Sequence, residues 1–562
     1  MTLLIAAIGL LASIYAVLPR ERRLELRLRL TVFDRILAVL AFILILYCEY
    51  YAVFLSHPIH GIRIAWPLDS WPKGLKPADT IDIILLSWAA LTAVRMRLRR
   101  LSRWNVDTFR KLLDELYWAG GYEEIFNFLE RHRNELFRLK DSDFRMARLR
   151  RWFEPALWFR AITLDPAWLE FANNSPVPHG QSRTIRTSKL RSLAKSIVES
   201  LQFRLSWMRH LFPDYKKSEE VAATIIRNIL LSEQFISQMV GRRPYLGISI
   251  MEVWTRDGNR NEFIQSYLWK LMEEPSSVFY TELRNNQNMR SGGRYYLPES
   301  NRLLYFFLSD AGVAKENSAY KPVGDYVLML LDELGQSPSS DPYNRDLGYF
   351  REHDEWKSPI YAAIRFFDIM VEEALHQNIE WHMWLYYMPP IVEKMVRNYH
   401  INDPFSDPNN EWPNRYSYLI SEIFSSLRRW VTDANEVPKA QANVVLKRVD
   451  CQHENGNIPK SSLRALCESL FYALTAKELG DRQTRSLTDG VFELFFELRV
   501  TDGFQDYATV LLCCLREAGK HKSQHSTYIL SLRATFSIEE SEYRIKHVEE
   551  HVDELESFLN HL

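Results

Sequence analysis

Along most of the chain after residue 104, apolar residues recur at intervals of three and four, which is the spacing of one face of an α-helix. One such face is formed by Ile225, Ile229, Phe235 and Met239. The alternation typical of a half-buried strand is clear only in residues 24–30. A helix that buries one face needs neighbouring helices to cover it. The pattern therefore predicts an all-α protein in which residues 105–562 form a helical bundle or an irregular helical-repeat region.

Three apolar runs precede this region, at residues 3–18, 36–55 and 78–94. A helix rises 1.5 Å per residue, so about 20 residues cross a hydrocarbon core of about 30 Å. The runs therefore predict three transmembrane helices. Two ionisable residues, Glu49 and Asp82, lie inside the predicted spans, where such a group either has a function or reaches the headgroups.

Arginine residues cluster in two places, after the first run and after the third. Because positive charge is retained on the cytoplasmic side, both clusters are expected there. This predicts a multi-pass membrane protein with its N-terminus outside and the bulk of the chain cytoplasmic. The clusters are also expected to contact anionic headgroups of a lipid bilayer. Their members are Arg20, Arg22, Arg23, Arg27, Arg29, Arg95, Arg97, Arg99, Arg100 and Arg103.

Polar stretches rich in turn residues suggest where the chain divides. The clearest begins near residue 336 and contains a Ser-Pro-Ser-Ser-Asp-Pro sequence. The expected organisation is a membrane domain at residues 1–104, helical regions at residues 105–336 and 337–535, and a C-terminal helix at residues 536–562.

Composition excludes several functional classes. Lys and Arg number 70 and Asp and Glu 71, so the net charge does not favour nucleic acid as a partner. The five cysteines include the adjacent Cys513 and Cys514 and no CxxC pair, so neither a disulfide framework nor a structural zinc site is expected. The sequence also lacks the GxxxxGK[ST], GxGxxG, GxSxG and HExxH motifs. We therefore expect no cofactor, no metal and no common enzyme site.

The C-terminal segment has apolar residues seven positions apart, the repeat of a coiled coil. The two interleaved sets are Ile538, Ile545, Val552 and Leu559, and Ser541, Val548, Leu555 and Leu562. This repeat predicts one continuous heptad helix. It either joins two copies in a homodimer, with Arg544 facing Glu549 of the other copy, or packs on the body of its own chain.

Two short motifs contain potential metal ligands. Glu373 and His376 match the E-x-x-H of four-helix di-iron proteins, but no second copy of the motif occurs. They are expected to form a solvated helix end. His547 and His551 have the H-x-x-E-H order of inverted zinc peptidases, which need a further ligand well downstream. Only 11 residues follow His551, so no zinc is expected there.

Arg204 and His210 resemble the Arg-x4-6-His motif of HEPN-type ribonucleases, helical proteins in which these residues cleave RNA within a dimer. The resemblance is limited to this motif. It implies that His210 acts as acid or base and that Arg204 stabilises the phosphate.

The sequence is most consistent with a membrane-anchored helical scaffold, interaction or regulatory protein that binds another protein. One alternative is a membrane effector, in which the helical region senses a signal and gates or assembles the spans to change permeability. A second alternative is a membrane-tethered HEPN-like ribonuclease.

Overall fold

A computed structural model shows how the predicted helices are arranged. The structure describes residues 16–29, 32–51, 77–98, 101–141, 215–291, 294–377, 379, 383–401, 410–437, 457–476 and 479–562. Regular structure in these ranges is helical apart from one two-stranded hairpin, which confirms the all-α class. The chain forms two compact units, one of residues 1–232 and 253–255 and the other of residues 233–252 and 256–562.

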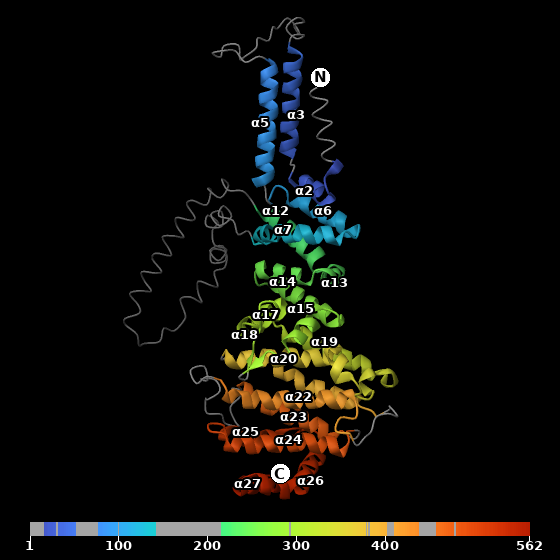
Figure 1. Cartoon of the computed structure of the whole chain (residues 1–562), viewed down its shortest axis with the longest axis vertical. Coiled ribbons are helices and arrows are strands. Elements are labelled where there is room, and N and C mark those ends of the chain that lie inside the picture. Colours follow the sequence, from blue (N-terminus) through green and yellow to red (C-terminus); the bar gives the residue numbers. More distant parts are fainter. Residues whose placement is uncertain are drawn as a thin grey trace, which may run out of the picture. The chain divides into compact units, whose positions relative to one another are not determined.

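The helices described for the first unit are shown in Figure 1. They are α2 (Arg20–Arg29), α3 (Val32–Glu49), α5 (Pro77–Leu98), α6 (Val106–Trp118), α7 (Tyr122–Lys140) and α12 (Lys216–Ile225), with a π-helical turn at Ile226–Leu230. Gly120 has a φ of +71° in the turn between α6 and α7, a conformation that glycine adopts readily. This turn lets the two helices bury Phe109 and Phe126 together with α12.

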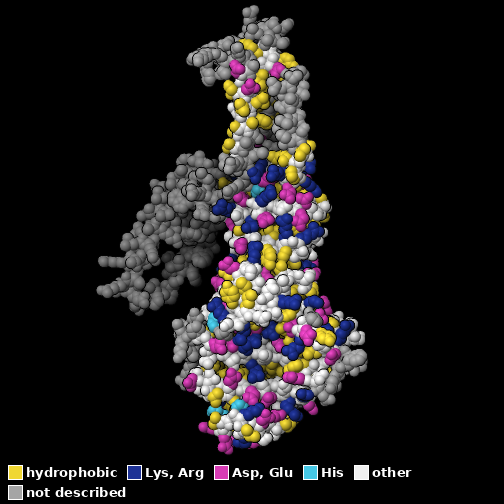
Figure 2. Space-filling view, in the orientation of Figure 1, with side chains coloured by type: hydrophobic (Ala, Val, Ile, Leu, Met, Phe, Trp, Pro, Cys, Tyr) yellow, Lys and Arg dark blue, Asp and Glu magenta, His cyan; other side chains and the backbone are white. Residues whose placement is uncertain are grey.

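Helices α3 and α5 pack side by side (Figure 1). Ile45 and Cys48 of α3 are buried, whereas Leu40, Ile43 and Leu86 are among the apolar side chains that stay exposed. The exposed apolar side chains of this pair are visible in Figure 2. Helix formation at both predicted spans is therefore confirmed, but burial of their apolar faces within the unit is small.

Among the described residues, no helix combines the length and the apolar character needed to cross a membrane. Helix α3 has 18 residues and contains Asp34 and Glu49, and α5 contains Asp79 and Asp82. Charged side chains are costly in hydrocarbon, and here they occupy the two helices that were expected to span it.

This finding overturns the predicted spans at residues 36–55 and 78–94. The prediction of a multi-pass membrane protein with its N-terminus outside and its bulk cytoplasmic is therefore wrong. The first predicted span, residues 3–18, lies almost wholly outside the described residues.

The second unit is a larger set of helices. They are α13 (Glu233–Arg242), α14 (Pro244–Val253), α15 (Gly258–Glu273), α16 (Val278–Asn286), α17 (Arg302–Leu308), α18 (Ala311–Glu316), α19 (Tyr320–Gly335), α20 (Pro359–His376), α21 (Met388–Asn398), α22 (Arg415–Thr432), α23 (Ile458–Thr475), α24 (Asp481–Val500), α25 (Gln505–Glu517), α26 (His525–Lys546) and α27 (Glu549–His561). Strands β1 (Arg290–Ser291) and β2 (Arg294–Tyr295) pair antiparallel, with Arg290 opposite Tyr295. Short 3-10 or π-helical turns lie at Pro338–Ser340, Pro342–Asn344, Phe350–Asp354, Glu355–Lys357, Met383–Tyr387 and Asp433–Asn435.

Successive helices of this unit cover one another in layers. Figure 1 shows α20, α22, α23 and α24 in order, and α23 contacts α21, α22 and α25. Local sequence sets the helix starts: Ser358 caps α20 just before Pro359, and Asn414 forms a capping box with Ser417 at the start of α22. Trp384 and Trp430 are among the largest side chains in the interior. Helix α20 is central, because every residue from Ile360 to His376 except Arg365 is buried.

The predicted continuous heptad helix at residues 536–562 is interrupted. Helix α26 ends at Lys546, His547 and Val548 have extended backbone angles, and α27 begins at Glu549. The break allows α27 to pack against α26. The prediction of one unbroken helix over this segment is therefore wrong, although all but the two linking residues and Leu562 are helical.

Candidate functional site

The heptad residues have different environments on the two sides of this break. Val552, Leu555 and Leu559 of α27 are buried. Ile538 and Ile545 of α26 are 53% and 85% exposed. The prediction that the segment packs on its own chain therefore holds for α27, whereas α26 keeps an apolar face exposed.

The exposed face of α26 continues toward the start of the helix. We call it the α26 stripe, and it consists of Leu530, Ala534, Ile538, Ser541 and Ile545, followed by Val548 just beyond the helix. The successive spacings are four, four, three, four and three residues, so these positions lie on one side of a helix. The opposite side of α26 is buried and includes Tyr528, Leu532, Phe536 and Tyr543. Helix α26 thus has two apolar faces, and one of them has no cover within the described chain.

Arg544 fixes the position of α27 beneath this stripe. Its guanidinium donates to Asp553 at 2.8 Å and to Glu556 at 2.7 Å, both on α27, and to Glu540 at 2.9 Å on α26. Arg544 was expected to face Glu549 of a second copy. In the structure it joins the two C-terminal helices of the same chain.

The two histidines of the H-x-x-E-H motif line a cavity of about 340 Å³ beside the stripe. The ring of His547 stacks on Phe496 with 4.1 Å between centroids, and its Nε2 lies 3.0 Å from Glu493 Oε2. Val500 and Val548 also line this cavity. Within the described ranges, no group of three or more His, Cys, Asp and Glu side chains is arranged to hold a metal ion.

A second unusual region is the charged interior of the same unit, where α20, α22 and the β hairpin meet. Asp368 on α20 is fully buried. Its carboxylate accepts hydrogen bonds from Arg429 at 2.5 Å, from Trp430 Nε1 at 2.8 Å and from the Tyr295 hydroxyl at 3.0 Å. Charge-assisted bonds of this kind compensate for the removal of a carboxylate from water.

The two arginines of the hairpin add three further pairings to this network. Arg290 donates to Glu372 at 2.9 Å and also bonds Asp433. Arg294 binds Glu373 through two hydrogen bonds of 3.0 and 2.9 Å. The bidentate geometry fixes direction as well as distance, so the hairpin is held against α20. We call Asp368 and these ion pairs the α20 network.

The two central carboxyl groups of the α20 network have opposite pKa shifts. Burial alone would raise the pKa of Asp368, but the charges of Arg429 and Arg365 outweigh it and lower the pKa. Burial, followed by the repulsion of Asp368, raises the pKa of Glu372 far above its usual range. Asp368 therefore ionises more readily than a free carboxyl group, and Glu372 holds its proton to a higher pH than a free carboxyl group does.

The E-x-x-H motif lies in this network and not at a solvated helix end. Glu373 is only 2% exposed, and His376 is buried too. The expectation of a solvated end is wrong because the motif belongs to the most buried helix of the unit. Arginine binds the carboxylates that a metal would need, so the arrangement serves to dock the hairpin.

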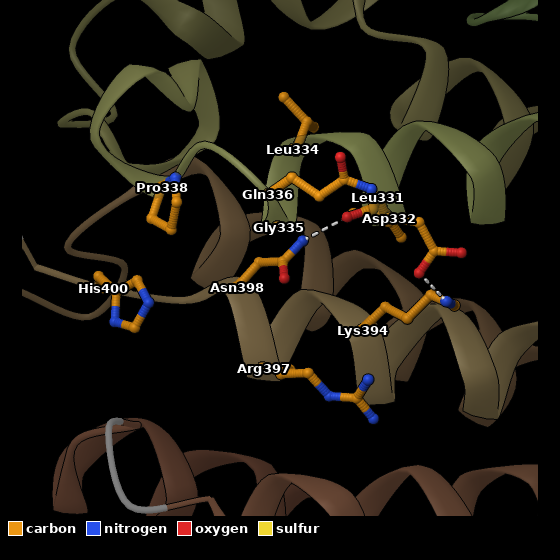
Figure 3. A pocket seen from close by; sticks show the side chains of 10 residues that line it. All are labelled: Leu331, Asp332, Leu334, Gly335, Gln336, Pro338, Lys394, Arg397, Asn398 and His400. Carbon is orange, nitrogen blue, oxygen red and sulfur yellow. Dashed lines mark hydrogen bonds and ion pairs between the residues drawn. The ribbon is translucent and has the colours of Figure 1, made fainter.

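A polar pocket of about 280 Å³ lies between the end of α19 and α21 (Figure 3). Asn398 Nδ2 donates to the Leu331 carbonyl at 2.7 Å, and Lys394 is paired with Asp332. A Cβ at Gly335 would lie 2.7 Å from Asn398 Oδ1, so glycine is needed for this close approach. Arg397, the other cation on α21 here, bonds Glu393 at 3.1 Å. These pairings tie α19 to α21, and they leave little uncompensated charge for a ligand.

The structure also locates most of the predicted membrane-facing residues. Glu49 and Asp82 are exposed on α3 and α5. Arg20 and Arg27 lie 3.1 and 3.5 Å from Glu124 and Glu115, within the first unit. Two other members also have partners: Arg29 pairs with Glu25 at 2.5 Å, and Arg103 lies over the ring of Trp104.

Some predicted residues lie outside the described residues. These are Arg99, Arg100, Arg204 and His210. The ribonuclease alternative rests on the last two, so it stays a prediction.

Comparisons of the chain with protein-family models, with curated proteins and with solved structures found no match. The functional argument therefore depends on the chain's own residues. The sequence indicated four of the six residues of the α26 stripe through the heptad spacing, but it missed Leu530 and Ala534, which extend the same face. It missed the α20 network entirely, because the arginines lie about 60 to 80 positions away from α20 in the sequence.

Proposed function

We propose that this protein is a helical interaction scaffold that self-associates through the α26 stripe. The observation that carries this proposal is the exposed apolar face of α26, with Ile545 85% exposed and Ile538 53% exposed. Exposed apolar residues scattered singly are ordinary, but a contiguous row on one helix is typical of a surface that binds another molecule.

The spacing of the stripe favours a second copy of the same helix as the partner. Its three-four spacing is that of the seam between two coiled-coil helices, and a row of this kind is complementary to itself about a two-fold axis. Because Tyr543 and Phe536 anchor the opposite side of α26, the stripe is presented on a fixed support. A rigid apolar face loses little conformational freedom when it binds.

The rest of the second unit fits a scaffold. Its helices are stacked in layers, and its mixed surface charges are visible in Figure 2. The pocket of Figure 3 is lined by side chains that bond one another. These features support a role in holding a binding surface more than a role in chemistry.

Sedimentation velocity of the purified full chain tests this function. We expect the wild type to be a dimer and the double variant Ile538→Glu with Ile545→Glu to be a monomer, since four buried charges would face one another across the seam. The matched control is Trp118→Glu, which also alters a large side chain that is 85% exposed but lies on α6 of the first unit.

Circular dichroism provides the folding check, because both replaced isoleucines are exposed and the helical signal should be unchanged. A wild type that stays monomeric at micromolar concentration would contradict the proposal. So would a double variant that remains dimeric.

A further inference from the structure

A further cavity lies between α23 and α25, apart from the α26 stripe and from the α20 network. Its volume is about 540 Å³. Cys514 lines it together with three cations, Lys460, Arg464 and Arg516. Two acids, Glu468 and Glu517, also line the cavity. This is a partly exposed thiol in surroundings with more basic than acidic groups, the environment in which reactive cysteines occur.

A second thiol lies directly behind the first. Cys467 on α23 is fully buried, and its S–H donates to the Leu511 carbonyl on α25 at 3.9 Å, one helical turn before Cys514. The two thiols are close enough for each to shift the pKa of the other. Tyr528 of α26 completes the group, since it is fully buried close to both sulfurs and its hydroxyl has no hydrogen-bond partner in the structure.

The two thiols are electrostatically unlike. The neighbouring thiol of Cys467 lowers the pKa of Cys514, and although burial opposes this, the charges of Arg464 and Lys460 add to the lowering. Burial raises the pKa of Cys467 well above its usual range. Cys514 therefore forms a thiolate more readily than a free cysteine, whereas Cys467 retains its proton and can donate it.

We propose that Cys514 and Cys467 form a peroxide-sensitive thiol pair, in which Cys514 is the site of oxidation and Cys467 is the resolving thiol. In the first step the Cys514 thiolate attacks one oxygen of hydrogen peroxide. The S–O bond forms, the O–O bond breaks, and hydroxide leaves, which takes up a proton to become water. The product is the sulfenic acid of Cys514.

In the second step the sulfur of Cys467 attacks the sulfur of this sulfenic acid. The S–S bond forms, the S–O bond breaks, and the hydroxyl leaves as water with the Cys467 proton. The peroxide is reduced by two electrons and the two thiols are oxidised to one disulfide. The bond would join α23 to α25 covalently.

The neighbour in sequence, Cys513, does not take the resolving role. It is already disulfide-bonded in the structure, although the sequence led us to expect no disulfide framework. Cys467 and Cys514 are both free thiols. The pair therefore consists of one cysteine from each of two packed helices.

Peptide mapping of the full chain after treatment with hydrogen peroxide tests this site, with dimedone present to trap sulfenic acid. We expect wild type to give the Cys467–Cys514 disulfide, and Cys467→Ser to give the dimedone adduct of Cys514. Cys48 is the internal control, because it is a buried free thiol whose pKa burial raises. It should stay reduced while Cys514 reacts.

A second variant tests the site without altering either sulfur. Arg464→Gln should lower the rate of Cys514 oxidation severalfold, because less thiolate is present when this charge is removed. Wild type in which Cys514 reacts no faster than Cys48 would overturn the proposal. A disulfide between Cys514 and any cysteine other than Cys467 would overturn it as well.

Discussion

The α20 network and the α26 stripe reverse the usual placement of residue types within one unit. In the network, carboxylates and arginines lie inside the protein, with Asp368 fully buried. In the stripe, isoleucines lie outside, with Ile545 85% exposed. Asp368 and Ile545 both lie in regular helices, so neither reversal follows from secondary structure.

The two regions differ in whether the chain itself supplies the partner. Each buried carboxylate of the network is matched by arginine, as Asp368 is by Arg429 and Glu373 by Arg294. Once such a network is complete, it specifies one arrangement of hairpin and helices. The stripe has no such match among the described residues. A buried charge that is paired within the chain indicates a structural role. An apolar side chain that stays exposed on the surface indicates an interaction with another molecule.

The largest expected effect is the loss of the network's central anion. Asp368→Asn should lower the free energy of unfolding by about 3–5 kcal/mol, because Arg429 loses its fully buried counter-charge and Arg365 keeps only Glu422. Urea denaturation followed by circular dichroism measures this. The control is Asp332→Asn, which removes a more exposed ion pair with Lys394 and should cost about 1 kcal/mol or less. Equal losses in the two variants would show that the network is not stabilising.

The next effect separates the two halves of the heptad pattern. Leu555→Ala should destabilise the protein by about 2–5 kcal/mol, since Leu555 is fully buried under α26. Ile545→Ala should change stability by only about 0.5 kcal/mol, because Ile545 is exposed. Thermal unfolding at a concentration where the chain is monomeric gives both values. A large loss in Ile545→Ala would mean that the stripe packs within the chain.

A smaller effect concerns pH. The pKa of Glu372 is raised in the folded protein, so its contribution to stability is complete below the ordinary value of 4.5 and declines as the pH rises above it. Glu372→Gln cannot release a proton, and its stability should therefore increase relative to wild type between pH 5 and pH 8, as judged from midpoints of urea unfolding. Glu393→Gln is the exposed control, and it should follow wild type. A difference that shrinks with rising pH would contradict the assignment of the proton to Glu372.

Several parts of this structure were predictable from local sequence. The three-four spacing identified the helices in the described parts of residues 105–562. The heptad positions from Ile538 to Leu559 also indicated an apolar face correctly. The heptad pattern did not predict the break at His547 and Val548. The apolar residues keep the same spacing on both sides of these two residues, so the sequence looks like one continuous helix.

The sequence was least informative where distant segments meet. Glu373 and His376 appeared to be a polar helix end, since nothing near them in the chain shows that Arg294 binds there. The apolar runs at residues 36–55 and 78–94 suggested membrane spans, but the helices that formed include Asp34, Glu49, Asp79 and Asp82. Cys467 and Cys514 are 47 positions apart, so their contact was invisible before α23 packed on α25.

The sequence by itself therefore determined the helical class, because periodicity, caps and turn residues act over a few positions of the chain. Tertiary structure alone decided which faces of the helices are covered, which charges are paired and which thiols touch. The physical reason is that burial and electrostatic energies depend on neighbours in space, and in this protein those neighbours are often more than 50 residues away. The exposed stripe of α26 is the apolar face that remained after that packing was complete.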